Sequence, residues 1–374
     1  MKRIVWVLVL MITTAPAWAA NKKITVQQLK DLLVSMQQYN KTDQDTANHL
    51  KEIELNEELT DSAASSLESY LPGPLSNEQI EILKRQSAFL APPATDIPAT
   101  PAPDAAAQQA MLAKAADFAS KVYARNPHLS VTKTTLRFED HVIITNSIGL
   151  HNTDMLLGPI LLINTQVDPV ETDKGVEKPA ASRAKTKWGE NDKISEGEPG
   201  TNLGAIFLEA SSAGKFEWLR WQMIDGWQTA VFSFAVEKKK SHFDVSYCCF
   251  PKTDTLTTGS MLMTNGSMIH SISTWVPFKK VVGYHGEFFI NPNTGLVVRV
   301  ITRAELKPTD FVFREDRRID YGSVYLAGKA YMLPRVSITA MEVVPNGDNN
   351  TATRTIRHTL FLALYQNYKL AGAL

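Results

Sequence analysis

The chain has 374 residues with 39 basic and 39 acidic side chains, so its formal net charge is zero at pH 7. This balance gives no reason to expect nucleic acid or a strongly anionic surface as a partner. A hydrophobic content of 44% is ordinary for a globular protein, and the length exceeds one typical hydrophobic core, so two structural units are expected.

Residues 1–19 have the pattern of a secretory signal peptide. Lys2 and Arg3 precede an apolar run over residues 4–12, and Ala17-Trp18-Ala19 provides the small-x-small cleavage pattern. The apolar run is too short to cross a membrane as a helix, which requires about 20 residues. We therefore expect a periplasmic or secreted protein without a transmembrane span.

Residues 24–90 are predicted to form a small helical module. Thr25-x-x-Gln28 and Ser76-x-x-Gln79 match the capping box that begins a helix, and Pro72-Gly73-Pro74 is expected to break the chain. Two more helices are expected near 47–53 and 63–71. Because such short helices are unstable alone, an antiparallel bundle is predicted. Its acidic surface is interpreted as a solvated face, with a docking surface for a protein partner as the alternative.

Residues 91–103 contain five prolines, which is typical of a semi-rigid extended linker, so a domain boundary is placed there. Asp104 is expected to cap a long helix that ends at Asn126-Pro127. The second domain then covers residues 104–374. Within it, residues 166–200 are rich in Lys, Glu, Asp, Pro and Gly, and they are predicted to form a long polar loop that is either disordered or a lid.

The remaining sequence alternates apolar and polar residues between short turns. Asp225-Gly226 is a hairpin signal that joins predicted strands at 216–224 and 227–236. Residues 136–138 and 142–144 are predicted to form an opening hairpin. Further strands are predicted at 243–249, 261–263, 269–275, 284–290, 296–306, 311–321, 324–326, 331–343 and 355–368. This pattern predicts an α+β fold with an N-terminal helical bundle and a large curled antiparallel β-sheet resembling a half-barrel. Helices at 104–125 and 202–213 are expected to cover the concave face.

Common catalytic signatures are missing from the sequence. It contains no Gly-x-x-x-x-Gly-Lys phosphate loop, no Gly-x-Ser-x-Gly and no His-Glu-x-x-His. The eight histidines have no ligand-like spacing, so neither a metal nor a cofactor is expected. His285 and Glu287 alternate on one predicted strand face. They are the candidate acid/base pair of an envelope hydrolase with 166–200 as its lid, and a surface hydrogen bond is the alternative.

Two other groups of residues are candidate sites. Six aromatic side chains lie on two adjacent predicted strands: Phe216, Trp218, Trp221, Trp227, Phe232 and Phe234. They are expected to be core residues, with the wall of a cavity for a lipid or another apolar ligand as the alternative. Cys248 and Cys249 are the two cysteines of the chain. Because neighbouring strand residues point to opposite faces, two buried thiols are expected and a vicinal disulfide is the alternative.

Two segments carry a resemblance to known proteins. Phe234-Ala-Val-Glu-Lys-Lys-Lys-Ser-His-Phe-Asp-Val-Ser-Tyr-Cys-Cys-Phe250 and Val282-Gly-Tyr-His-Gly-Glu-Phe-Phe-Ile-Asn-Pro-Asn-Thr-Gly-Leu-Val-Val-Arg299 resemble an uncharacterised family of exported acidobacterial proteins. That resemblance covers nearly the whole chain after the signal and implies no activity. The Asn-Pro-Asn-Thr-Gly turn between two strands is also similar to the half-barrels of periplasmic lipoprotein carriers. This second resemblance implies a curled sheet that binds acyl chains.

The leading functional hypothesis is an exported binding or interaction protein. Its curled sheet would hold a lipid or another apolar ligand, and its helical module would engage a protein partner. The alternatives are the envelope hydrolase and a purely structural or regulatory envelope module.

Overall fold

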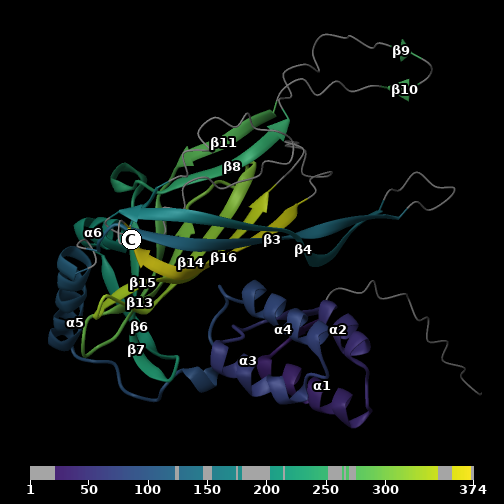
Figure 1. The fold of residues 1–374 in the computed structure, drawn as a ribbon, viewed down its shortest axis with the longest axis horizontal. Coiled ribbons are helices and arrows are strands. Elements are labelled where there is room, and N and C mark those ends of the chain that lie inside the picture. Colours follow the sequence, from purple (N-terminus) through teal and green to yellow (C-terminus); the bar gives the residue numbers. More distant parts are fainter. Residues whose placement is uncertain are drawn as a thin grey trace, which may run out of the picture.

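The computed structural model describes residues 22–122, 126–145, 154–173, 176–178, 203–213, 215–251, 263–264, 267–268, 275–343 and 356–371. The predicted signal peptide and most of the predicted 166–200 loop lie outside these residues. The described chain combines α-helices with a large, open antiparallel β-sheet, which confirms that part of the sequence prediction (Figure 1). Within the described ranges, no helix is long and apolar enough to cross a membrane.

The N-terminal part contains four short helices and one small pair of strands. The helices are α1 (Val26–Gln38), α2 (Asp43–Lys51), α3 (Asp61–Leu67) and α4 (Pro74–Gln86), and β1 (Lys22–Ile24) pairs in parallel with β2 (Ile53–Leu55). Their apolar sides meet in one buried core that includes Leu29, Leu33, Leu50, Leu67 and Leu83. The strand pair, which helical periodicity does not reveal, joins the start of the module to its middle.

The two predicted capping boxes have different outcomes. At α1, the Thr25 hydroxyl accepts from the Gln28 backbone N–H and the Gln28 amide oxygen accepts from that of Thr25, so this prediction is confirmed. Helix α4 instead begins at Pro74, and Ser76 lies inside its first turn. The Asp43 carboxylate of α2 accepts two backbone N–H bonds there, each 2.9 Å long. The Ser76 prediction is wrong because proline suits the first helical position and a neighbouring helix supplies the cap.

Residues 91–103 run along the sheet to the next helix. They include a short 3-10 turn (Ala94–Asp96), and the backbone oxygen of Pro101 accepts a 2.9 Å hydrogen bond from the Trp221 indole. Helix α5 (Ala105–Asp117) follows, with Asp104 as its N-cap, and continues into a π-helical turn (Phe118–Val122). The linker is therefore anchored to an edge strand of the main sheet, β6 (Phe216–Ile224).

The main sheet has ten strands, and every neighbouring pair is antiparallel. Their order is β5 (Val176–Lys178), β4 (Asp154–Asp173), β3 (Leu129–Thr145), β16 (Arg357–Leu370), β15 (Lys329–Val343), β14 (Val312–Leu326), β13 (Val297–Ala304), β12 (Tyr284–Ile290), β7 (Trp227–Val236) and β6 (Phe216–Ile224). Strands β5 and β6 are the two edges, so the sheet is open.

Two further pairs of strands are separate from the main sheet. Strand β8 (Asp244–Pro251) pairs with β11 (Trp275–Val281) as a ribbon, and the short strands β9 (Met263–Thr264) and β10 (Ser267–Met268) pair with each other.

Three sequence predictions about strands need correction. Residues 136–144 belong to one continuous strand, β3, and do not form a hairpin. Strand β4 extends to Asp173, so the predicted polar loop does not begin at residue 166. Gln166, Asp168 and Thr172 share the inward face of this part of the strand with Val170, which packs against Val131 and Tyr365. Strand β14 is continuous from Val312 to Leu326, because Gly322 keeps its ladder pairing with Leu333 instead of ending the strand.

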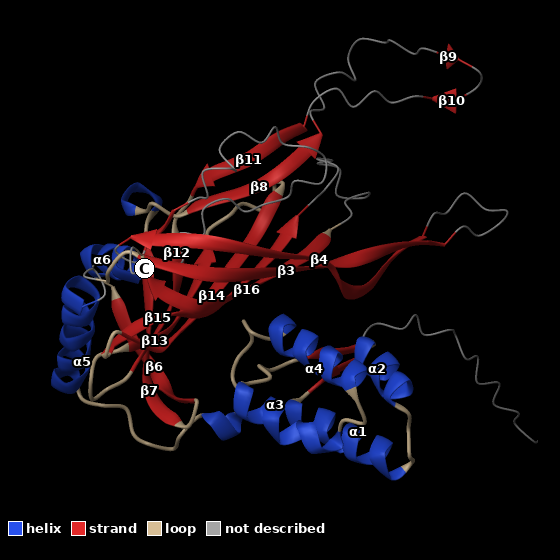
Figure 2. Cartoon of the chain, in the orientation of Figure 1, coloured by secondary structure: helices blue, strands red, loops and turns tan. Residues whose placement is uncertain are grey.

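Other parts of the chain pack against both faces of the main sheet (Figure 2). On the face that we call the helix face, helix α5, helix α6 (Leu203–Ala213) and the β8 ribbon share a core with the sheet. On the opposite face, here the module face, Ile82 and Phe89 of the helical module pack against Phe289, Ile338 and Leu360. Because strand side chains alternate, strands β7, β12, β13, β15 and β16 contribute to both cores.

Candidate functional site

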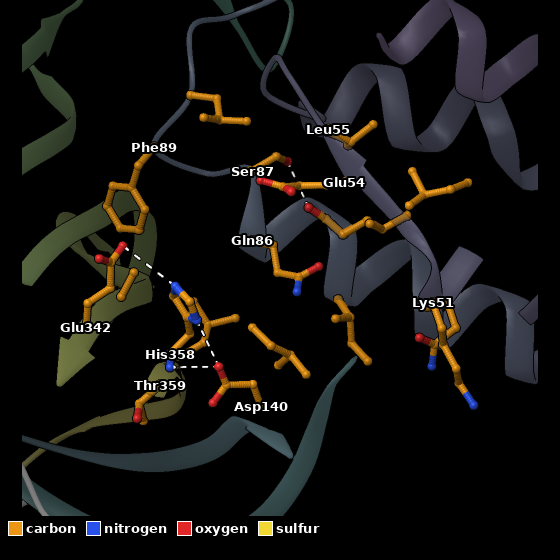
Figure 3. A pocket seen from close by; sticks show the side chains of 18 of the residues that line it. Lys51, Glu54, Leu55, Gln86, Ser87, Phe89, Asp140, Glu342, His358 and Thr359 are labelled. Atoms are coloured by element: carbon orange, nitrogen blue, oxygen red, sulfur yellow. Dashed lines mark hydrogen bonds and ion pairs between the residues drawn. The ribbon is translucent and has the colours of Figure 1, made fainter. Parts of the chain in front are cut away.

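A cavity of about 420 Å³ lies between the helical module and the module face of the sheet (Figure 3). Both parts supply apolar side chains to its wall, including Leu50, Ile82, Leu83, Phe89, Ile160 and Leu360. Ligand pockets in proteins typically measure about 300–1,000 Å³. The cavity therefore has the size of a small-molecule site.

Strand register gives the sheet side of the cavity a charged end and an apolar end. His358 is paired with Glu342 across β16 and β15, and Leu360 is paired with Ala340 two residues further along. Since residues two apart share a face, all four side chains point toward the module. The cavity thus brings ionisable groups and hydrocarbon side by side.

His358 is the central polar group of this wall (Figure 3). Its Nδ1 lies 2.8 Å from Oδ2 of Asp140, which also accepts the His358 backbone N–H at 3.0 Å. Its Nε2 lies 4.0 Å from Oε1 of Glu342. The hydrogen bond to Asp140 raises the pKa of His358 although burial opposes it, and the charges of both carboxylates add to the increase. The imidazole is therefore biased toward its cationic, hydrogen-bond-donating form.

Arg314 extends the charged wall beyond Glu342. Its guanidinium lies 2.6 Å from Glu342 and 2.7 Å from Asp316. The resulting row runs Asp140–His358–Glu342–Arg314–Asp316. Oδ1 of Asp140 is buried and has no hydrogen-bond partner within the described part of the chain. Within the described residues, one carboxylate oxygen beside His358 is therefore available to accept a hydrogen bond.

The hydroxyl that the helical module contributes to the cavity is engaged by the backbone. Ser87 is the hydroxyl that the module contributes, and it donates to the Leu83 backbone oxygen while accepting from the Leu59 backbone N–H. A nucleophile needs a free hydroxyl or thiol beside its base, and Ser87 is already engaged. Ser87 is therefore not a free nucleophile for His358.

A buried charge network joins the module to the sheet. Glu58 of the module lies 2.6 Å from Arg318 and 3.3 Å from Arg299. Asp320 lies 2.5 Å from Arg299 and 2.8 Å from Arg318. Two guanidinium groups thus alternate with two carboxylates, which is the arrangement that compensates buried charge.

The predicted aromatic cluster divides between packed and exposed residues. Phe216, Trp218, Trp221, Phe232 and Phe234 all pack in the helix-face core, whereas Trp227 is 69% exposed beside the hairpin turn. Phe207 of α6 lies 5.4 Å from Phe216, and Phe288 lies 4.5 Å from Phe234, measured between ring centroids. At these separations the rings pack against one another.

His285 and Glu287 share the module face of β12, but each has other partners. Glu287 accepts from Arg220 at 2.8 Å and from Arg303 at 3.3 Å. His285 is half exposed and lies 3.9 Å from Glu305. Glu287 is thus engaged by two guanidinium groups rather than by His285.

The remaining sequence predictions concern the two cysteines and metal binding. Cys248 and Cys249 fall on strand β8, but their side chains lie outside the described structure, so both the thiol and the disulfide interpretations stay predictions. Among the described residues, no three His, Cys, Asp or Glu side chains are grouped to hold a metal ion.

Sequence reasoning missed the cavity, because Asp140, Glu342 and His358 are far apart in the chain. The available signal was a charged residue at an inward position of a predicted strand: His358 shares its face with the buried Leu360 and Leu362. No protein-family model matches the chain, and neither the curated proteins nor the solved structures give a significant match. The functional argument therefore depends on geometry.

Proposed function

We propose that the protein is an exported binding protein that holds a small amphipathic ligand between its helical module and its sheet. The observation that carries this proposal is the cavity of about 420 Å³. Its wall combines the charged residues Asp140, His358 and Glu342 with apolar side chains. Sites for small molecules typically combine a mostly apolar lining with a few placed polar groups.

The two ends of the cavity define the ligand. Its polar end would lie against His358 and Glu342, which together offer a donor and an acceptor. Its hydrocarbon part would lie against Leu360, Phe89 and Leu83. An acyl-chain compound has this character, as the resemblance to lipoprotein carriers implies.

The remaining parts of the proposal concern location and architecture. The pattern of residues 1–19 supports export to the periplasm or beyond. The sheet is proposed to act as a half-barrel with α5 and α6 as its covers, and the packed aromatic cluster stabilises that end. The acidic outer surface of the module is the proposed contact for a protein partner.

Native mass spectrometry after gentle purification, followed by titration with a fluorescent fatty acid, tests the proposal. Ala340 lines the cavity, so Ala340→Phe should fill it and weaken fatty-acid binding at least tenfold. Ala330→Phe is the matched control, because Ala330 is exposed on the same strand. Failure of the wild-type protein to bind, or equal binding by both variants and wild type, would exclude this cavity as the site.

A further inference from the structure

Arginines occupy the interior of the helix face at a distance from the aromatic cluster. Arg317 on β14 pairs with Thr339, Thr339 pairs with Phe361, and Phe361 pairs with Arg137 on β3. All four residues therefore lie in one row across the sheet and point to the same side. Arg317 is 2% exposed and Arg137 is 9% exposed.

The carboxylates beside these arginines are too few to balance them. Arg137 contacts Glu139, and Arg357 lies 3.7 Å from the same carboxylate. Arg317 contacts Glu315. Among the residues that the structure describes, three guanidinium groups thus share two carboxylates. Asp244 on the overlying ribbon does not restore the balance, because it lies 3.1 Å from Lys279 and pairs with it.

Several donors in this region have no partner among the described residues. They are Nε of Arg137, Nε of Arg357, and both Nε and Nη1 of Arg317. A buried polar group without a partner is unfavourable, and a guanidinium has the planar fork that fits a carboxylate or phosphate. Oδ1 of Asp244 is a buried acceptor without a partner among the described residues, and the four unpartnered donors outnumber it, so a further acceptor group fits this region.

The ribbon above the arginines supplies a cover. The Phe243 ring centroid lies 4.8 Å from the Arg317 guanidinium carbon, and the Asp244 backbone oxygen accepts from Arg317 at 3.5 Å. Tyr247 of the same strand is buried, and this burial raises its pKa against the opposing charges of Arg137 and Arg357. Its hydroxyl therefore stays protonated beside them. Arg357 is the most accessible of the three arginines, with 26% of its side chain exposed.

We propose that Arg137 and Arg357, which share the Glu139 carboxylate, form a binding site for an oxyanion, the carboxylate or phosphate group of a small ligand. The site lies on the opposite face of the sheet from the cavity beside His358, so it does not depend on the function proposed above. Arg357 and Arg137 would make the contacts, whereas Arg317 lies three strands from Arg137 along the row, with Thr339 and Phe361 between them.

Isothermal titration calorimetry on the full chain tests the site with inorganic phosphate, decanoate and uncharged decanol. The measurements use the Ala340→Phe background, so that decanoate cannot occupy the other cavity. Binding of phosphate identifies a free phosphate-type ligand, and binding of decanoate without decanol identifies a carboxylate amphiphile. Either result supports the oxyanion site, and no binding of phosphate or decanoate would overturn it.

Arg357→Gln should weaken that binding at least tenfold, since it removes a charged donor at the accessible end. Arg335→Gln is the control, because Arg335 is exposed on β15. If Arg357→Gln does not fold, Arg357→Lys keeps the charge and should retain weaker but measurable binding. Equal affinities for wild type, the Arg357 variant and the Arg335 variant would place the anion elsewhere and reject the proposal.

Discussion

Glu58 and Arg318 form a buried ion pair, 2.6 Å between Oε1 and Nη1, across 260 positions of the chain. Glu58 belongs to the helical module and Arg318 to the centre of the sheet, and less than a tenth of either side chain is exposed. The two units expected from chain length are therefore joined by charge as well as by apolar packing.

Glu58→Ala should destabilise the protein by about 3–5 kcal/mol, the usual cost of removing one partner from a buried charge pair. The cost arises because Arg318 and Arg299 would keep their buried charges with one carboxylate fewer. Urea denaturation followed by circular dichroism measures the change in the free energy of unfolding.

Glu54→Ala is the control for this experiment. Glu54 pairs with Lys23 at 3.0 Å, but both side chains are at least half exposed. Such surface pairs contribute about 0–1 kcal/mol. A similar small loss for both variants would show that the Glu58 network does not hold the module to the sheet.

Asp320 should make the same interface sensitive to acid. Burial alone would raise the pKa of its carboxyl, but the charges of Arg299 and Arg318 outweigh that effect and lower it to about 2. A carboxyl whose folded pKa lies below its unfolded value stabilises the fold above about pH 4, and this contribution is lost as the pH falls toward 2. At neutral pH, the ionised Asp320 carboxylate therefore adds about 2 kcal/mol to the free energy of unfolding.

Stability measured between pH 2 and pH 6 tests this expectation. Asp320→Asn should flatten the pH dependence at the acid end, whereas Asp225→Asn in an exposed turn should leave it unchanged. An Asp320→Asn protein with the acid slope of the wild type would mean that other groups govern acid unfolding.

Strand positions were predictable where one local signal decided them. Asp225-Gly226 adopts positive φ at both residues, and the strands on either side, β6 and β7, have the bounds that this turn predicts. Gly322 was misleading, because alternation alone does not show that a ladder continues through a glycine. The Asp43 cap of α4 was also hidden, since a side chain from another helix replaces the local hydroxyl.

The cavity was beyond sequence reasoning for a different reason. Its charged row depends on β3, β15 and β16 being neighbours, and the order of strands in a sheet is not contained in the periodicity of any one strand. The row of Arg137 and Arg317 depends on the same order. The aromatic residues could be found because all six lie in two strands joined by one short turn.

His358 should report directly on the charged row. Its pKa is raised first by the hydrogen bond to Asp140, so its stabilising contribution is complete below pH 6.5 and is lost as the pH rises through the higher folded value. Asp140→Asn should move the pKa of His358 down, as measured by NMR titration of the imidazole. Asp104→Asn, at the start of the distant helix α5, should not. An unchanged titration in Asp140→Asn would show that Asp140 does not control the charge of the cavity.

Phe207→Ala tests how completely the aromatic end of the sheet is filled. Phe207 is 1% exposed, and its ring centroid lies 5.0 Å from that of Phe288 and 5.4 Å from that of Phe216. Removing such a ring from a close-packed core typically costs about 3–5 kcal/mol, because the cavity left behind collapses only partly. Leu208→Ala, at a position that is 56% exposed on the same helix, should cost less than about 1 kcal/mol. Urea denaturation measures the change in the free energy of unfolding. A loss below about 1 kcal/mol in Phe207→Ala would mean that this end of the sheet is loosely packed. The aromatic residues would then again be candidates for the wall of a ligand cavity.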